Sequence, residues 1–323
     1  MDKLEKKARR PLLPALTALS GLASFGQNKN EVWFRDGTNG KLDRCKPIRD
    51  VSLELYPFVW ASISAYQYDR EPRVHRGVDN PCNRIDPKAV LQQAWVMWEE
   101  IPALGDLSCQ LGRDMTRAHL RVQVWESKQQ DKIMVAFGGT HNAADFKADF
   151  RWAEEFFIHP NDQYSVLFCE FTAAFIAAYK KRQNARHGSQ APQIIATGHS
   201  LGGGLAQGFA YAIELAEDAD VRVTDVIAFD PSPVTGGREL PGWRHIAKSV
   251  HIQRVYNRGE ILAILRGVFN ATMPPRPNSA QFTDIRFAAD WRWEQPLSVL
   301  GTVRAHLLRP LACTMLEQAQ IIV

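Results

Sequence analysis

The sequence has few cysteines and no closely spaced pair of them. Its five cysteines, Cys45, Cys82, Cys109, Cys169 and Cys313, include no C-x-x-C motif, so neither a zinc site nor a dense disulfide framework is expected. Cys45 and Cys82 are the pair that an oxidising compartment would allow to form a disulfide. The odd number of cysteines instead favours reduced thiols.

A large excess of charge of one sign is also missing. The 39 Lys and Arg residues are nearly balanced by 35 Asp and Glu residues, which gives a formal net charge of +4. Proteins that bind nucleic acids usually carry a dense cationic surface. The sequence therefore predicts no nucleic-acid partner, although a mild attraction to an anionic membrane surface is compatible with this charge.

No apolar run is long enough to span a bilayer as a helix. The basic stretch 6–10 precedes the apolar run 11–23, which is the order of a secretory signal. Prolines interrupt this run, and Asp2 and Glu5 reduce the positive charge before it. We therefore favour a flexible or surface-lying amphipathic tail and a cytoplasmic or membrane-surface location, and leave export open.

The length and hydrophobic content indicate one large domain. A chain of 323 residues with 45% hydrophobic residues can fill the core of a single large α/β domain. Residues 26–50 are polar and rich in turn-forming residues, so we expect a loop or linker there. The predicted organisation is an N-terminal basic and apolar tail with a linker at 1–47, and one catalytic domain at 48–323.

Hydrophobic patterns predict strands that alternate with helices. The expected strands are 120–125, 133–137, 194–197, 221–229 and 250–256, and the expected helices are 51–66, 145–157, 164–181 and 201–215. A second apolar stretch covers 89–101, after an irregular surface segment at 70–88. This order is typical of an α/β fold with a mostly parallel central sheet and helices on both faces.

Several of the predicted strands end in small or polar residues. Two of these ends are 138–140 and 198–200. A third end carries an acidic residue, for which Glu260 is the first candidate and Asp230 the alternative. Open parallel sheets hold their sites at the carboxyl ends of the strands. We therefore expect these ends to converge on one site.

The stretch 194–204 carries the strongest motif. Gly198, Ser200 and Gly202 form a G-x-S-x-G between an apolar strand and an alanine-rich helix. A serine hydroxyl is a weak nucleophile, and a sharp strand-to-helix turn lifts it out of the sheet to the positive end of a helix. The motif predicts a nucleophilic serine.

Two blocks of the sequence resemble the class 3 (fungal-type) lipases, which have the α/β-hydrolase fold. The block 198–206, Gly-His-Ser-Leu-Gly-Gly-Gly-Leu-Ala, is similar to the nucleophile turn of that family. The block 135–140 with the following Asp-Phe pairs at 145–146 and 149–150 resembles the family's F-R-G-T segment. Gly138 stands where the family usually has arginine, and Asp230 where it usually has glycine.

The resemblance implies roles for particular residues. Ser200 would be the nucleophile, and the oxyanion hole would consist of the backbone N–H of Leu201 with the backbone or hydroxyl of Thr140. Donors fixed in a dry cleft stabilise the negative charge that develops during attack on an ester. Thr140 could instead cap a following helix. We expect no cofactor and no metal.

A serine nucleophile needs a histidine base and an orienting carboxylate. In this fold they follow in the order serine, acid, histidine, which leaves His245, His251 and His306 after Ser200. If Glu260 is the acid, only His306 follows it; if Asp230 is the acid, all of these histidines remain. The segment 254–260 resembles the family's acid segment, and His306 its late histidine. We favour Ser200, Glu260 and His306 as the catalytic triad, with Asp230 as the alternative acid.

Other histidines have plainer interpretations. His251 alternates with apolar residues on a strand and is expected to be a packed side chain. His199 is expected to point away from the serine in such a turn.

The resemblance implies a lipase or esterase, with a phospholipase included, that cleaves carboxylic esters of lipids and contacts a lipid interface or peripheral membrane surface. Apolar segments at 262–269 and 273–275, with Trp291 and Trp293, could line an acyl-chain cleft or form a lid. The alternatives are an α/β-hydrolase acting on a non-lipid ester or thioester, and a non-catalytic module that keeps the serine turn for its structure.

Overall fold

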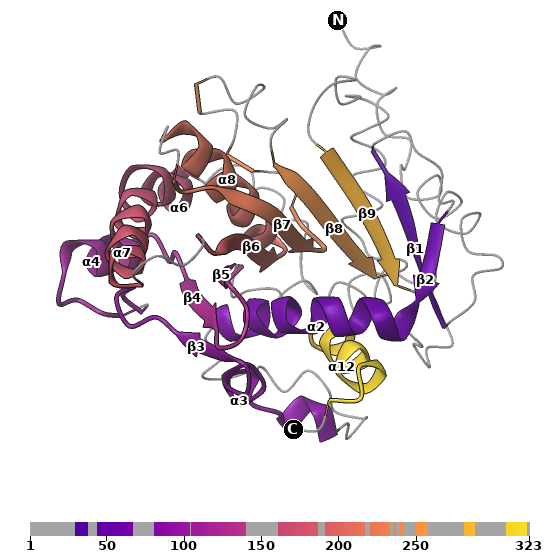
Figure 1. Cartoon of the computed structure of the whole chain (residues 1–323). Helices are drawn as coiled ribbons and strands as arrows, with labels where there is room; N and C mark the ends of the chain where they lie inside the picture. The colour runs from indigo at the N-terminus through magenta and orange to yellow at the C-terminus, as the bar shows by residue number, and fades with distance from the viewer. Residues whose placement is uncertain are drawn as a thin grey trace, which may run out of the picture.

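The computed structural model contains one nine-stranded mixed sheet with helices on both faces (Figure 1). It describes residues 30–37, 44–66, 81–103, 105–139, 161–186, 191–216, 220–232, 235–236, 240–241, 250–257, 281–287 and 308–321. The strands are β1 (Glu31–Asp36), β2 (Arg44–Pro47), β3 (Trp95–Met97), β4 (Val122–Ser127), β5 (Lys132–Phe137), β6 (Gln193–His199), β7 (Val223–Phe229), β8 (His251–Asn257) and β9 (Gln281–Phe287). Their order in the sheet is β2-β1-β9-β8-β7-β6-β5-β4-β3.

Strands β5 to β9 form the parallel centre of the sheet. Each pairs in parallel with its neighbour, whereas β3, β4, β1 and β2 add antiparallel pairs at the two sides. Parallel strands have both faces covered, which explains why β5 and β6 are buried at every position after the first. The predicted α/β class with a mostly parallel central sheet is confirmed.

Two helical layers cover the sheet. The helices are α2 (Ile48–Ala65), η1 (Pro81–Arg84), α3 (Pro87–Gln92), α4 (Gln110–Arg117), α6 (Asn161–Val166), a π-helical turn η3 (Leu167–Phe171), α7 (Thr172–Ala185), α8 (Leu201–Leu215) and α12 (Leu308–Gln318). Helices α2, α3 and α12 cover one face, and α4, α6, α7 and α8 the other (Figure 1). Within the described ranges, no helix is both long and apolar enough to cross a membrane.

The face under α7 and α8 is packed with aromatic rings. Phe137 at the end of β5 contacts Phe171 and Phe209, and Phe175 meets Phe209 edge-on with centroids 5.2 Å apart. All of these rings are buried. They fix α8, the helix that follows the serine turn, against the end of β5.

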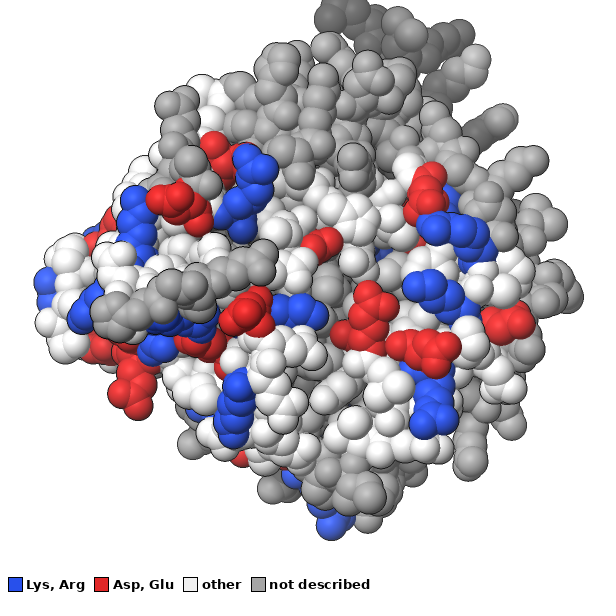
Figure 2. All heavy atoms as spheres, viewed as in Figure 1, with Lys and Arg blue, Asp and Glu red and all other residues white. Residues whose placement is uncertain are grey.

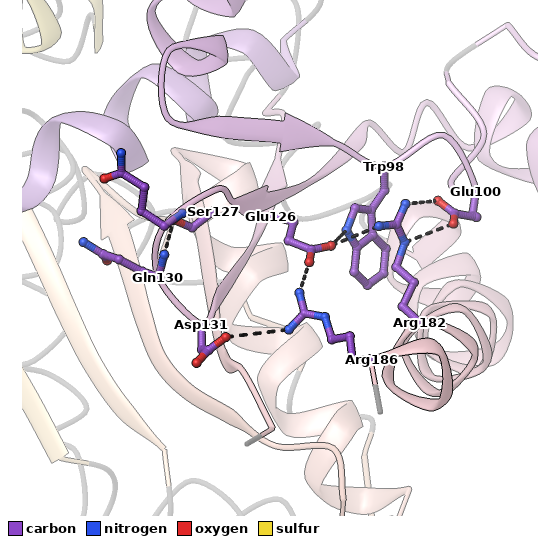
Figure 3. A network of polar contacts seen from close by, with 9 residues as sticks. Trp98, Glu100, Glu126, Ser127, Gln130, Asp131, Arg182 and Arg186 are labelled. Atoms are coloured by element: carbon purple, nitrogen blue, oxygen red, sulfur yellow. Dashed lines mark hydrogen bonds and ion pairs between the residues drawn. The ribbon is translucent and has the colours of Figure 1, made fainter. Parts of the chain in front are cut away.

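A polar network joins α7 to the β3–β4 side of the sheet (Figure 3). The guanidinium of Arg182 donates hydrogen bonds to Glu100 and Glu126 and lies over the ring of Trp98, 4.6 Å from its centroid. Trp98 Nε1 donates to Glu126 at 2.8 Å, and Arg186 pairs with the same carboxylate. The hydrogen bonds from Arg182 lower the pKa of Glu100. Basic and acidic side chains also lie intermixed over the described part of the face in Figure 2, as the near balance of charge predicts.

Most predicted elements are present, with one correction before residue 48; the predicted helix 145–157 lies outside the described residues. The predicted helix 201–215 is α8 with the same bounds, and the predicted strands match β4 to β8 within a few residues. The loop or linker predicted for 26–50 is wrong where Glu31–Asp36 and Arg44–Pro47 form β1 and β2. The sheet therefore extends before the residue at which the domain was predicted to begin.

The cysteine prediction also needs correction. Cys82 of η1 and Cys313 of α12 form a disulfide, with Cα atoms 5.8 Å apart. The favoured reduced thiols are therefore wrong for these two cysteines, and the alternative Cys45–Cys82 pair does not form, because Cys45 is free and exposed. An odd number of cysteines does not argue against a disulfide, because the remaining cysteines can stay unpaired. Cys109 and Cys169 are also free and exposed.

Candidate active site

Ser200 occupies a sharp turn between β6 and α8. Its backbone has φ 56° and ψ −122°, and α8 begins at the next residue, Leu201. A positive φ is uncommon for a residue with a side chain and points to a conformation that its surroundings impose. Ser200 is half-buried. The strand, strained turn and helix are the geometry that the G-x-S-x-G motif predicts.

The motif glycines allow backbones to approach one another. A Cβ atom on Gly198 would lie 2.3 Å from Gly202 O, and one on Gly202 would lie 2.3 Å from Phe137 O. On Gly203, a Cβ would lie 2.7 Å from Pro231 Cβ. The sequence needs glycine at each position because any side chain there would push α8 away from the sheet.

Backbone hydrogen bonds join the serine turn to the end of β7. Ser200 N–H donates to Phe229 O at 3.0 Å, and Ser232 N–H donates to Ser200 O at 2.9 Å. The Ser200 carbonyl also accepts from Gly203 N–H at 3.0 Å. These bonds fix the main chain on which the Ser200 hydroxyl is mounted.

The N-terminus of α8 supplies donors beside Ser200. Leu201 is the first helical residue, and helix geometry leaves the first N–H groups without an intrahelical acceptor. These groups and the helix dipole make this a place where negative charge is stabilised. The predicted donor Leu201 thus lies next to the predicted nucleophile.

The end of β5 lies beside the serine turn. Phe137 pairs with Gly198, and a Cβ on Gly138 would lie 2.5 Å from Ala65 O, at the end of α2. This contact leaves no room for a side chain at position 138. The predicted donor Thr140 lies outside the described residues.

Asp230 follows the last residue of β7, at the same edge of the sheet. It is fully buried and has φ 40°, and its Oδ1 accepts the N–H of Asn257 at 3.2 Å. Its own N–H donates to Val255 O at 2.8 Å. A buried carboxylate in a positive-φ conformation is energetically costly, which is typical of functional positions. Asp230 is therefore brought near Ser200 and holds the last residue of β8.

Of the predicted triad and its alternative acid, the described residues include Ser200 and Asp230. Glu260 and His306 lie outside the described residues, as do His245 and the segments 262–269, 273–275 and 291–293 of the predicted cleft. Asn257, which Asp230 binds, precedes Glu260 by a short stretch of sequence. The described parts of the chain contain no group of three or more His, Cys, Asp or Glu residues that could hold a metal.

His251 lies away from the serine, at the opposite edge of the sheet. It begins β8, whereas Ser200 follows the last residue of β6, a parallel strand. The prediction that it is a packed side chain is only partly right, because its side chain is 35% exposed and polar contacts hold it. Nδ1 lies 2.9 Å from Asp225 Oδ1, and Nε2 lies 3.2 Å from Thr283 Oγ1.

Sequence reasoning missed Tyr66. The residue follows the last turn of α2, and its hydroxyl lies 2.7 Å from Nδ1 of His199, the residue before Ser200. The sequence offered only the helical spacing of apolar residues through 51–66, which places Tyr66 on the packed side without showing its partner.

A comparison with protein families supports the resemblance seen in the sequence. Residues 134–269 match the model of the family lipase (class 3). The match includes the end of β5, the serine turn and the ends of β7 and β8. In this segment, which is less than half of its length, the chain is similar to the class 3 lipase family. A search of curated proteins found no match.

Solved lipases share a general likeness with the chain. A Rhizomucor miehei lipase propeptide complex is 14% identical with a TM-score of 0.41, over 77% of this chain and 71% of that chain. A lipase from Rhizopus microsporus var. chinensis is 12% identical with a TM-score of 0.42, over 76% of this chain and 73% of that chain. The strand order and the serine turn carry the fold assignment.

Proposed function

We propose that the protein is a serine hydrolase that cleaves carboxylic esters of lipids through an acyl-enzyme on Ser200. The observation that carries this proposal is the conformation of Ser200, which has φ 56° between β6 and the N-terminus of α8. The match of residues 134–269 to the class 3 lipase family supports lipid esters as the substrate class. Metal and cofactor chemistry are not required for this reaction.

In the proposed mechanism, His306 accepts the proton of the Ser200 hydroxyl as its oxygen attacks the ester carbonyl. The tetrahedral oxyanion accepts hydrogen bonds from Leu201 N–H and from Thr140, and loss of one such donor typically costs about 3 kcal/mol in the barrier. The C–O bond to the leaving alcohol then breaks, and His306 returns the proton to that alcohol. Water, deprotonated by His306, then attacks the acyl carbonyl; the bond between the acyl carbon and Ser200 Oγ breaks, His306 returns the proton to Oγ, and the carboxylic acid is released.

Glu260 is the proposed acid that orients His306, and Asp230 is the alternative. The resemblance of 254–260 to the family's acid segment supports Glu260, whereas the burial of Asp230 near the serine turn supports Asp230. The hydrogen bond from Asn257 to Asp230 is consistent with either role, because it holds the end of β8 from which the chain continues to Glu260.

The experiment is ester hydrolysis by the wild-type protein and by Ser200→Ala, with Ser108→Ala as a control. Ser108 is exposed in a loop, so its replacement should leave turnover unchanged. A panel of acyl chain lengths and of glycerol, phosphoglycerol, simple alcohol and thioester leaving groups defines the substrate. Loss of turnover in Ser200→Ala alone supports the proposal, and undiminished hydrolysis by Ser200→Ala refutes it. Activity confined to thioesters or short non-lipid esters would refute the lipid part.

A further inference from the structure

Tyr66 contacts both the side chain and the main chain of the residue that precedes the proposed nucleophile. Its Oη lies 2.7 Å from His199 Nδ1 and 3.2 Å from His199 O. Both residues are buried, at 2% and 3% exposure. The contact joins the end of α2 to the end of β6, segments that are far apart in the sequence.

One placement of the protons makes both contacts good hydrogen bonds. A phenol has one proton to donate, and a carbonyl oxygen can only accept. Both contacts are hydrogen bonds when the Tyr66 hydroxyl donates to His199 O and His199 Nδ1–H donates to the Tyr66 oxygen. This pairing places a proton on Nδ1 of His199 and fixes both the ring and the carbonyl of that residue.

The same hydroxyl lies against the end of β5. A Cβ on Gly139 would lie 2.3 Å from Tyr66 Oη and 2.9 Å from His199 O. From its other side, Arg121 Nη1 donates to Gly139 O at 3.2 Å, and Arg121 is also buried. Gly139 is thus fixed between α2, β6 and the residue that precedes β4. The next residue in the sequence is Thr140, the proposed oxyanion donor.

We propose that Tyr66 is a positioning residue for ester hydrolysis, which acts through His199 and Gly139 without touching the substrate. The inference rests on the proposed function of Ser200 and Thr140. It assigns one hydroxyl to hold the nucleophile turn and the oxyanion segment at a fixed separation. Catalysis depends on this separation, because a displacement of about 1 Å between a nucleophile and its donors can reduce turnover by about a hundredfold.

Removal of the hydroxyl should lower kcat and leave KM nearly unchanged. Tyr66→Phe keeps the ring but deprives His199 Nδ1–H and His199 O of their common partner. Both groups are buried and will move toward other partners, because an unmade buried hydrogen bond is costly. We expect kcat to fall about tenfold, with KM within about twofold, because the oxyanion donors act mainly in the transition state.

The test compares Tyr66→Phe with Tyr179→Phe on a soluble acyl ester. Tyr179 is buried on α7, away from the serine turn, so its replacement controls for loss of a buried tyrosine hydroxyl. Active-site titration with a fluorophosphonate gives the concentration of competent sites. Because kcat is then calculated per competent site, a partly unfolded variant does not give a falsely low kcat. A fall in kcat for Tyr66→Phe alone supports the inference. An equal kcat per site in wild type and Tyr66→Phe, or the same fall in both variants, overturns it.

A second readout does not depend on activity. In ¹⁵N-histidine-labelled protein, His199 Nδ1–H should give a proton signal protected from exchange, present in wild type and Tyr179→Phe and lost in Tyr66→Phe. Persistence of this signal in Tyr66→Phe would overturn the inference. If Tyr66→Phe does not fold, Arg121→Lys, which weakens the other contact to Gly139, should show the same fall in kcat at near-constant KM. An inactive wild-type protein would instead refute the proposed hydrolysis, while the signal would still report the contact.

Discussion

Ser200 and Asp230 occupy matching places at the ends of neighbouring parallel strands, and both have positive φ angles. The angles are 56° and 40°, and His199 pairs with Phe229 immediately before them. Neither residue is glycine, so both conformations are strained and must be held by their surroundings. The strain lies at the carboxyl edge of the sheet, where the class 3 lipase match also falls.

The choice between the two acids is decided by comparing Glu260→Gln with Asp230→Asn. An acid that orients the base should reduce kcat by about three to four orders of magnitude when it becomes an amide, because the amide disrupts the orientation and charge stabilisation of the histidine. We expect this loss in Glu260→Gln and a smaller one in Asp230→Asn. Thermal unfolding of both variants checks that the fold persists. A larger loss in Asp230→Asn at unchanged stability would make Asp230 the acid.

Gly202→Ala should destabilise the protein. The added Cβ would lie 2.3 Å from Phe137 O, and neither the helix nor the sheet backbone can yield cheaply. We expect a loss of about 2–4 kcal/mol in the free energy of unfolding, measured by urea denaturation. Ser200→Ala, at the same turn, should cost much less because it adds no atoms. Equal stability of Gly202→Ala and wild type would contradict the close approach of α8 and β5.

The Cys82–Cys313 disulfide should stabilise the fold. It joins residues 231 apart in the sequence, so Cys82→Ser, or reduction, should lower the free energy of unfolding by about 3–5 kcal/mol. Cys45→Ser should have little effect, since Cys45 is free and exposed. Thiol titration of the unreduced, denatured protein should count the free cysteines as Cys45, Cys109 and Cys169. A count that includes all five cysteines would contradict the disulfide.

Tyr211 should make the protein sensitive to alkali. Burial raises the pKa of Tyr211 from 10.0 to about 12, so the folded protein keeps a proton that the unfolded chain loses near pH 10. The stability from this group is therefore complete below pH 10 and is lost as the pH rises toward 12. As the pH rises from 9 to 11, the free energy of unfolding, measured with urea, should fall by about 1.4 kcal/mol less in Tyr211→Phe than in wild type. Parallel losses in the two proteins would contradict the shift.

The elements that the sequence predicts well are those that depend on neighbouring residues along the chain. The strand before Ser200 and the helix after it follow from short-range patterns, and α8 has the predicted bounds. The polar, turn-forming composition of 26–50 predicts a linker, and β2 within it has the sequence Arg-Cys-Lys-Pro with every residue exposed. An edge strand of this kind carries no apolar alternation, and its pairing with β1 becomes visible only in the folded sheet.

The parts that could not be predicted depend on contacts between distant segments. Nothing near Cys82 indicates that Cys313 is its partner, since the fold alone brings η1 to α12. Tyr66 likewise meets His199 only because α2 ends beside the ends of β5 and β6. The periodicity of apolar residues predicts that Tyr66 lies on the apolar face of a helix. It does not predict the contacts of its hydroxyl, because these depend on a residue far away in the sequence.

The central claim is that Ser200 is an activated nucleophile, and intact-mass analysis after treatment with a fluorophosphonate tests it most directly. The wild-type protein should gain the mass of one phosphonyl group, with peptide mapping to Ser200, because the reagent reacts only with a serine activated by a base. Ser200→Ala should gain none, and Ser108→Ala should react as wild type does. An unmodified wild-type protein, or a label on another serine that persists in Ser200→Ala, would contradict the account.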